Sequence, residues 1–357
     1  MLIQTAARRH AREVYLANPK AWWPHNAIDL WWRAAKRAQN RELLALRMLD
    51  HWRAHATWRL NGSLFGPEMN GFLEVTNAQA YARLLDKLSV SALVALSLYR
   101  RLRANHATGI FRVVRTDANE HDAVLFAHTL DVDELLGHAG ANSHVIKTAY
   151  DQTGNGRDYS DNGGSTRPRI VLTGALDVNG AGKPSALWDG TNDTLFRNDA
   201  LGLTGSPALT SACVLAQTSG SASGYFMHLG GSAATTGWRS NLDNASNSIA
   251  ANNAGSQRTF AATGLTADHG FIIGKAANAL VNAFTAEQDG VALTQSGISG
   301  GTNVQAMTNS FACWGSTVSS GTPATPQAMR SNFLAHFGAV LSGNDLEQLR
   351  LEMLQHM

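Results

Sequence analysis

The sequence has few cysteines, few prolines and few charged residues. Two cysteines among 357 residues cannot hold a chain of this length together, which excludes a small disulfide-rich module. Charged residues make up 16%, against roughly 25% in typical soluble domains. Hydrophobic residues reach 44%, which is enough for a sizeable core and excludes wholesale disorder. No apolar run approaches the roughly 18 residues of a membrane-spanning helix, so we expect no membrane insertion.

The charges that are present are unevenly placed. Residues 1–60 carry 11 lysines and arginines against 4 acids, a net charge of +7, and the remainder carries 18 against 23, or −5. Six of the nine tryptophans also lie in this first segment, and helical spacing of apolar residues predicts helices over 26–60 and 77–103. Tryptophan and arginine dominate the anchors of protein interfaces, so we expect partner docking here. The docking residues would be Trp22, Trp23, Trp31, Trp32, Trp52, Arg33 and Arg37.

Two alternatives for this basic segment stay open. The tryptophans can pack within the chain itself, or the basic residues can neutralise phosphates while the aromatic rings stack on bases. Tryptophans beside a leucine stripe at helical spacing favour packing against protein. We therefore expect no nucleic-acid partner.

From about residue 109 the pattern changes to short apolar runs separated by Gly, Asn, Asp and Ser. These runs predict strands at 110–114, 145–150, 169–172, 208–216, 225–229, 270–273, 279–287, 291–294 and 309–314, with one short helix at 132–139. Asp289-Gly290 is the signal of a tight hairpin. Ser342 is a good N-cap residue, and Asp345 three residues later is expected to face the free amides at the start of a closing helix. The pattern indicates a mainly β sandwich or barrel.

The segment Tyr150-Asp-Gln-Thr-Gly-Asn-Gly-Arg-Asp158 resembles a segment of arabinofuranosidase B catalytic domains, which also occurs in related concanavalin A-like (laminin G-like) domains of bacteriophage virion proteins. Trp188–Asp193 is similar to a turn of laminin G-like sandwiches, and Glu287–Val291 to their strand–turn–strand unit. The resemblance covers about residues 93–357. It implies a concanavalin A-like (jelly-roll) β-sandwich preceded by an N-terminal helical segment.

Five polar residues in these segments are candidate site residues. Gly154 and Gly156 permit a tight loop, in which Asp151, Asn155 and Asp158 can bond to the loop's own amides. Contact with a cation or a glycan is the alternative for these three and for Asp189 and Asp193. We expect no cofactor, with calcium as the possible exception, and whether any metal binds stays open.

The resemblance implies a retaining glycosidase, which needs two carboxyl groups, one as nucleophile and one as acid/base. Residues 200–242 and 290–344 contain no Asp or Glu, and the family places its pair in these windows. We therefore expect the chain not to be an enzyme. A different pair, such as Asp189 with Asp268 or Glu287, stays open.

These observations favour a non-enzymatic bacteriophage structural protein, located in the virion. Residues 1–70 would dock to other virion proteins, 71–104 would form a helical connector, and 105–357 would form the sandwich of a homo-oligomeric tail-fibre or decoration protein. Tyr225, Trp238 and Trp314 are candidate aromatic platforms for host-surface glycan, although core packing is the favoured role of each ring. The alternative functions are a carbohydrate-binding module outside a virion and a residual arabinofuranosidase-like glycosidase.

Overall fold

The structure is a computed structural model, and it describes residues 83–106, 109–126, 128–161, 166–218, 224–231, 237–243, 246–253, 256–280, 283–299, 307–319 and 322–357. The predicted helices at 1–70, with their tryptophans and arginines, lie outside the described residues, as does the first part of the connector. No described helix is both long enough and apolar enough to cross a membrane.

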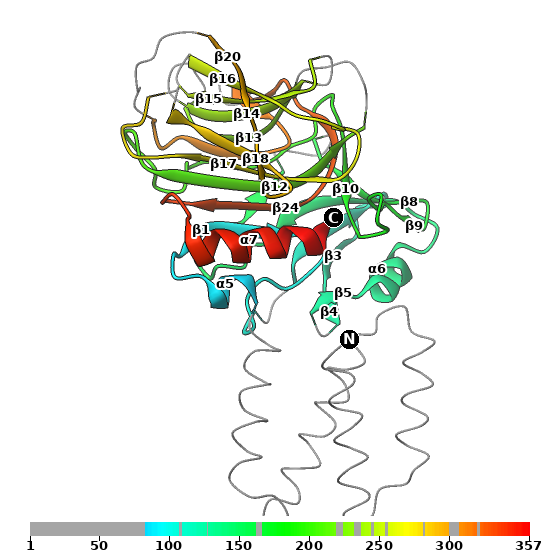
Figure 1. Cartoon of the computed structure of the whole chain (residues 1–357). Coiled ribbons are helices and arrows are strands. Elements are labelled where there is room, and N and C mark those ends of the chain that lie inside the picture. Colours follow the sequence, from blue (N-terminus) through cyan, green and yellow to red (C-terminus); the bar gives the residue numbers. More distant parts are fainter. Residues whose placement is uncertain are drawn as a thin grey trace, which may run out of the picture. The chain divides into compact units, whose positions relative to one another are not determined.

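The described chain is a β-sandwich whose strands pair antiparallel (Figure 1). One layer has the order β19, β18, β17, β12, β24, β1, and β10 pairs with the first half of β24. Its strands are β1 (Ala92–Ser97), β10 (Ala186–Asp189), β12 (Leu209–Gln217), β17 (His269–Lys275), β18 (Thr285–Gln288), β19 (Val291–Ala292) and β24 (Ala328–Phe337). We call this layer the covered sheet.

The second layer runs in the order β20, β16, β15, β14, β13, β21, β11, β7, β6, β2, β3. Its strands are β2 (Phe111–Arg115), β3 (Glu120–Ala123), β6 (His144–Ala149), β7 (Tyr159–Ser160), β11 (Leu195–Arg197), β13 (Gly224–Gly230), β14 (Gly237–Asp243), β15 (Ser248–Asn253), β16 (Ser256–Ala261), β20 (Gln295–Ser299) and β21 (Phe311–Trp314). Strand β8 (Arg169–Leu172) pairs with both β6 and β10 and so joins the two layers.

Short hairpins complete the strands. They are β4 (Leu125–Phe126) with β5 (Thr129–Leu130), β22 (Thr317–Ser319) with β23 (Thr322–Ala324), and β9 (Ala175–Leu176) against β8. The Asp289-Gly290 turn joins β18 to β19, and both of its residues have positive φ, 53° and 80°. The hairpin predicted from this dipeptide is confirmed, since such a turn needs positive φ at both positions.

Two hydrophobic clusters hold the sandwich together. The larger lies between the layers and contains Trp188, Trp238 and Trp314. The smaller lies on the outer side of the covered sheet, where Ala212, Phe333 and Phe337 pack against residues of the helices α5 (Leu84–Lys87) and α7 (Gly343–His356). Helix α7 contacts β12, β17 and β24 (Figure 1). A third helix, α6 (Val132–Ala139), contacts β3 and β9.

The mainly β sandwich with a closing helix agrees with the prediction from sequence. The helix predicted over 77–103 is wrong within the described residues: only 84–87 are helical, and 92–97 form β1. Strand β1 is buried on both faces, with Val94 and Leu96 in the larger cluster and Ala92 and Ala95 in the smaller. A strand buried on both faces loses the polar alternation that identifies strands, and its leucines then match a helical period.

Candidate functional site

Four chain segments meet at one end of the sandwich. Asp189 pairs with Ala328 at the end of β10, and Tyr225 forms a bridge with Pro326 at the start of β13. The Gln327 amide nitrogen donates to the Gly315 carbonyl at 2.9 Å, and the Gly224 amide donates to the Gln327 side-chain oxygen at 3.0 Å. The segment 325–328 therefore links the turn 189–193, the start of β13 and the end of β21 into one region, which we call the end site.

Glycine makes this close approach of segments feasible. A Cβ atom on Gly315 would lie 2.2 Å from the Trp188 indole nitrogen, and one on Gly190 would lie 2.6 Å from the Ala328 Cβ. Both glycines also have positive φ, 93° and 76°. Any larger residue at these two positions would push the segments of the end site apart.

The turn between β10 and β11 carries two carboxyl groups in different surroundings. Asp193 is buried, and one of its oxygens accepts the Asp189 amide at 2.8 Å. The Asp189 side chain is exposed and accepts the Thr191 amide at 2.7 Å. The turn thus folds around its own aspartates, while one carboxyl group stays open to solvent.

Burial, together with the negative charge of Asp189, raises the pKa of Asp193 to about 7 against the opposing effects of the Asp189 amide and Arg169. A carboxylic acid with a pKa near 7 holds its proton at neutral pH in a substantial part of the molecules. Proton donation by a carboxyl group of raised pKa beside a second carboxylate is the pattern of an acid/base pair. Arg169 itself is held by Asp177 through bonds of 2.7 and 3.0 Å.

Of the three predicted aromatic platforms, Tyr225 belongs to the end site and is partly exposed. Its ring lies 5.8 Å from the Arg239 guanidinium carbon. Trp238 and Trp314 are fully buried, with ring contacts to Phe284 and Trp188 respectively. These two tryptophans are core residues, which agrees with the core packing favoured from sequence, and they cannot act as sugar platforms.

The loop 151–158 uses its polar groups within the chain. Asp151 accepts hydrogen bonds from the amides of Ala95, Thr153 and Arg157 and from the Thr153 hydroxyl. Asp158 accepts the Asp151 amide at 2.8 Å, and the Asn155 side chain donates to two carbonyls of β1. The Asp151 oxygens are therefore occupied by donors from the loop and from β1, as in a loop-stabilising cluster.

No group of three or more His, Cys, Asp or Glu residues that could hold a metal occurs in the described part of the chain. Asp189 and Asp193 share a turn, whereas the Asp151 loop is fastened to β1. The calcium site considered from sequence would need these carboxylates together with further oxygens, and the structure does not bring them into one such group.

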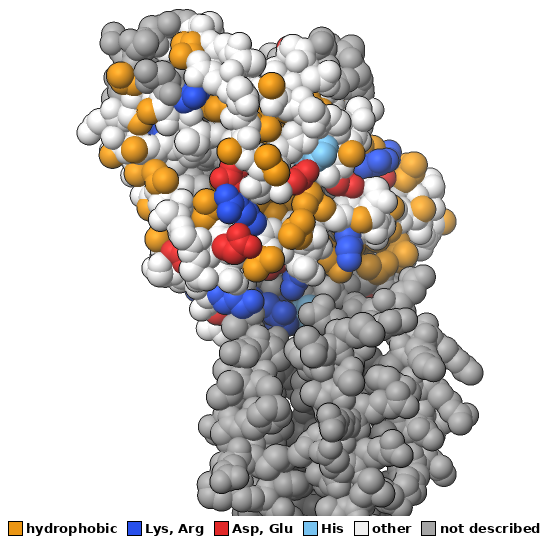
Figure 2. All heavy atoms as spheres, in the orientation of Figure 1, with side chains coloured by type: hydrophobic (Ala, Val, Ile, Leu, Met, Phe, Trp, Pro, Cys, Tyr) orange, Lys and Arg blue, Asp and Glu red, His pale blue; other side chains and the backbone are white. Residues whose placement is uncertain are grey.

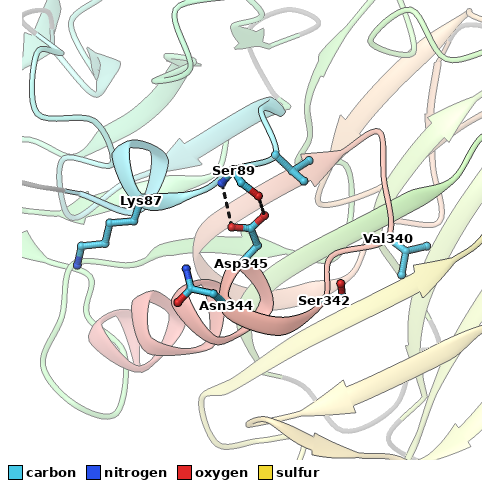
Figure 3. Close-up of a pocket in the computed structure, with 7 residues that line it drawn as sticks. Lys87, Ser89, Val340, Ser342, Asn344 and Asp345 are labelled. Atoms are coloured by element: carbon cyan, nitrogen blue, oxygen red, sulfur yellow. Dashed lines mark hydrogen bonds between the residues drawn. The ribbon is translucent and has the colours of Figure 1, made fainter.

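The hollows beside α7 have a structural role. One of about 350 Å³ is lined by Lys87, Ser89, Val90, Val340, Ser342, Asn344 and Asp345. Figure 3 shows Asp345 turned toward Ser89, whose amide and hydroxyl donate to it at 2.9 and 2.5 Å, while Lys87 points away. Asp345 was predicted to face the free amides of the helix, but it fastens α7 to the segment before β1 instead. Ser342 is the N-cap residue but makes no side-chain capping bond.

Charge is distributed unevenly over the surface. In the face shown in Figure 2, Asp, Glu, Lys and Arg side chains gather in the lower part of the described surface, and the part that holds β14–β16 in Figure 1 carries few. Residues 224–261 contain only three of these charged residues, Arg239, Asp243 and Arg258. This part of the sandwich therefore presents mostly neutral hydrogen-bonding groups.

No protein-family model and no curated protein matches the sequence. Among solved structures, the chain is similar to an arabinofuranosidase complexed with arabinofuranosyl-α-1,2-xylobiose, with 12% identity, a TM-score of 0.59 and coverage of 76% of this chain and 64% of the enzyme. It is also similar to a GH54 α-L-arabinofuranosidase soaked with a cyclic sulfate inhibitor, with 12% identity, a TM-score of 0.55 and coverage of 74% and 62%. The chain thus spans less than two thirds of the length of these enzymes.

These matches correct the interpretation made from sequence. They show a β-sandwich of the kind found in arabinofuranosidases, which confirms the predicted fold class. The prediction of a non-enzymatic bacteriophage structural protein is wrong, because the structures that the chain resembles are catalytic glycoside hydrolases. Virion location, homo-oligomer formation and partner docking by residues 1–70 stay untested predictions. The chain carries the fold of carbohydrate-active enzymes.

Proposed function

We propose that this chain is a glycoside hydrolase whose acid/base chemistry lies at the end site. The observation that carries the proposal is the pair of aspartates in the β10–β11 turn, one buried with a pKa of about 7 and one exposed. Glycoside hydrolysis needs one carboxyl group that holds a proton and a second that carries negative charge. The likeness of the fold to arabinofuranosidases supports the same class of reaction.

In this proposal Asp193 is the general acid and Asp189 its carboxylate partner. Asp193 donates its proton to the oxygen of the leaving group, and Asp189 stabilises or attacks the sugar carbon from which that oxygen departs. Water then replaces the leaving group, and its proton returns to the pair. The pair sits in one turn, and the charge of Asp189 contributes to the raised pKa of Asp193.

This assignment differs from the expectation that catalysis requires an acid in residues 200–242 or 290–344. Neither window contains Asp or Glu, yet 325–328 brings the second window against the 189–193 turn. An acid supplied by the 189–193 turn would therefore lie at the same end of the sandwich as residues 325–328 of the second window. The proposed pair therefore needs no carboxylate from either window.

The test is hydrolysis of a panel of 4-nitrophenyl glycosides, beginning with the α-L-arabinofuranoside that has been soaked into a variant of a GH54 enzyme. We expect Asp193→Asn to lower kcat by about 10²–10⁴-fold, the usual contribution of general acid–base catalysis. Activity of the unchanged chain should fall as pH rises through about 7, because Asp193 loses its proton there. Azide should restore turnover to Asp189→Ala if Asp189 attacks the sugar carbon.

Asp177→Asn is the matched control, since Asp177 pairs with Arg169 beside the turn and has no role in the proposed reaction. It should retain most of the activity. If Asp193→Asn and Asp177→Asn hydrolyse the panel equally well, or if no glycoside in the panel is cleaved by the unchanged chain, the assignment of the end site is wrong.

A further inference from the structure

One face of the second layer is distinguished by its side chains. Along β13–β16, Leu229, Trp238, Leu242, Ile249 and Phe260 point into the core between the layers. The alternate residues point to the opposite side, in cross-strand register: Tyr225 pairs with Asn241, Arg239 with Asn252, and Asn252 with Gln257. We call this set the polar face; its members are Tyr225, Arg239, Asn241, Asn252, Gln257 and Thr259. The same side of these strands also carries Asp243 and the buried residues His228, Ser248 and Ala250.

The polar face has the chemistry of a surface for a neutral polyhydroxyl ligand. Amides and a hydroxyl can each both donate and accept hydrogen bonds, as sugar hydroxyls do. The Asn252 amide nitrogen donates to the Asn241 side-chain oxygen at 2.9 Å, which orients both amides. Five of the six members are partly exposed, and Asn241 is 6% exposed.

The charge and shape of the polar face disfavour other classes of ligand. Arg239 is its single basic residue, and the carboxylate of Asp243 lies on the same side of β14, so the face lacks the several cations that a polyanion requires. Tyr225 is its single aromatic residue, so it also lacks the contiguous apolar area of a protein-docking patch. The amides can form hydrogen bonds with the hydroxyl groups at the edge of a sugar ring, and the single aromatic ring can stack on its apolar face.

The position of Tyr225 connects this surface with the end site. Its backbone amide donates to the Thr325 carbonyl at 3.0 Å, at the start of the segment whose Ala328 pairs with Asp189. The ring is held beside Arg239, on the adjacent strand of the polar face. The backbone of Tyr225 is therefore fixed to the same segment, 325–328, that pairs with Asp189.

We propose that the polar face of β13–β16 binds the neutral, oligomeric part of a glycan, with Tyr225 stacking on the sugar unit at the end of the face that adjoins segment 325–328. This inference rests on the proposed function only for the orientation of the glycan relative to the end site. The binding surface itself is argued from the side chains of β13–β16. Neighbouring strands lie about 4.8 Å apart, so the face spans about 14 Å from β13 to β16. That length suits an oligosaccharide better than a single sugar.

The test is calorimetric binding to the full chain carrying Asp193→Asn, with xylohexaose, arabinohexaose and cellohexaose and the three corresponding disaccharides as probes. We expect at least one hexaose to bind tenfold or more tightly than its disaccharide. Tyr225→Ala should weaken that binding at least tenfold, because stacking is lost, and Tyr225→Phe should restore most of it. Asn252→Ala should weaken it several-fold.

Leu351→Ala is the control, since this residue is 45% exposed on α7 and lies on the other layer. Equal binding by the Leu351 and Tyr225 variants would overturn the inference, and so would binding of polygalacturonate in preference to all three neutral hexaoses. Failure of the two proposals is distinguishable. Hexaose binding that depends on Tyr225 without hydrolysis by the unchanged chain retains the polar face and rejects the catalytic pair. Hydrolysis that is unchanged by substitution of Tyr225 or Asn252 retains the catalytic pair and rejects the polar face as the binding surface.

Discussion

The outer faces of the two layers of the sandwich differ: one is apolar and covered by helices, and the other carries polar side chains. The covered sheet buries Phe333, Ala335 and Phe337 against α5 and α7, so its central strands are apolar on both sides. Strands β13–β16 place aromatic and aliphatic residues inward, and amides and hydroxyls on the polar face. The helix makes one outer face part of the core, whereas the other face keeps groups that can bind a ligand.

Both layers nevertheless contain fully buried histidines, so we expect the free energy of unfolding to fall as the pH is lowered. Burial lowers the pKa of His336, in β24, and of His228, in β13, to about 3 in each case, and lowers that of His144 to about 4. The unfolded chain takes up protons from about pH 6.5 downward, before the folded chain does. Stability is therefore complete above about pH 6.5 and is lost as pH falls toward 3–4, by about 1.4 kcal/mol per pH unit for each histidine.

Urea unfolding at pH 7.5, 6.0, 5.0 and 4.5 measures this slope. His336→Gln and His228→Gln should each flatten it, and similar changes would indicate that the two layers exclude water equally. A slope that stays flat down to pH 4.5 in the unchanged chain would contradict the burial of these histidines.

The next largest effect is expected where α7 covers its sheet. Glu352 is 8% exposed, and its carboxylate lies 3.1 Å from the Arg100 guanidinium and 3.4 Å from the His356 ring nitrogen. Glu352→Ala leaves Arg100 buried without this partner, so we expect the free energy of unfolding to fall by about 3–5 kcal/mol. Chemical denaturation provides the measurement.

Leu351→Ala on the exposed side of the same helix is the matched control, and we expect a change within about 0.5 kcal/mol. An equal loss of stability in both variants would show that the buried contacts of Glu352 with Arg100 and His356 do not hold α7 to the sheet. The outer face of the covered sheet would then not differ from the polar face in the way described above.

A smaller loss is expected at the start of α7. Ser89→Ala removes the hydroxyl that donates to Asp345 and keeps the amide that donates to the other carboxylate oxygen. Hydrogen bonds to a charged group contribute about 1.5–3 kcal/mol, and half of the clamp remains, so a loss of about 1–2 kcal/mol is expected. These bonds also lower the pKa of Asp345, so the difference between Ser89→Ala and the unchanged chain should shrink as the carboxylate becomes protonated in acid.

The smallest effect on stability is expected on the polar face. Asn252→Ala removes a partly exposed amide and one side-chain hydrogen bond, so the free energy of unfolding should change by about 1 kcal/mol or less. The same substitution is expected to weaken hexaose binding several-fold. A loss of stability as large as that of Glu352→Ala would show that the polar face belongs to the core and would remove the contrast.

Much of the fold could be predicted from local sequence. The strand at 169–172 and the helix at 132–139 were placed at their observed bounds, and Asp289-Gly290 located its hairpin. Strands β14–β16 and β24 were not predicted. The first three contain many Asn, Ser and Ala residues, which have low strand propensity, and β24 mixes polar and apolar residues without alternation because it lies between two partner strands and under α7.

The candidate site could be predicted only in part from local sequence. Asp189, Asp193 and Tyr225 were singled out from sequence, and the structure brings their backbones to one segment, 325–328. The burial of Asp193, on which its proposed role as a proton donor rests, was missed, since no local pattern reveals it. The amides of Asn241 and Asn252 were missed because their strands were missed.

The sequence by itself determined the mainly β class, the low charge of 224–261 and the turn chemistry at positions that need glycine or aspartate. These properties depend on composition and on neighbours within a few residues. Only the tertiary structure decided that β1 is a strand, that Trp238 and Trp314 are core residues, and that Asp193 has a raised pKa. Each of these depends on burial by segments distant in the chain, because desolvation and packing are set by what lies close in space.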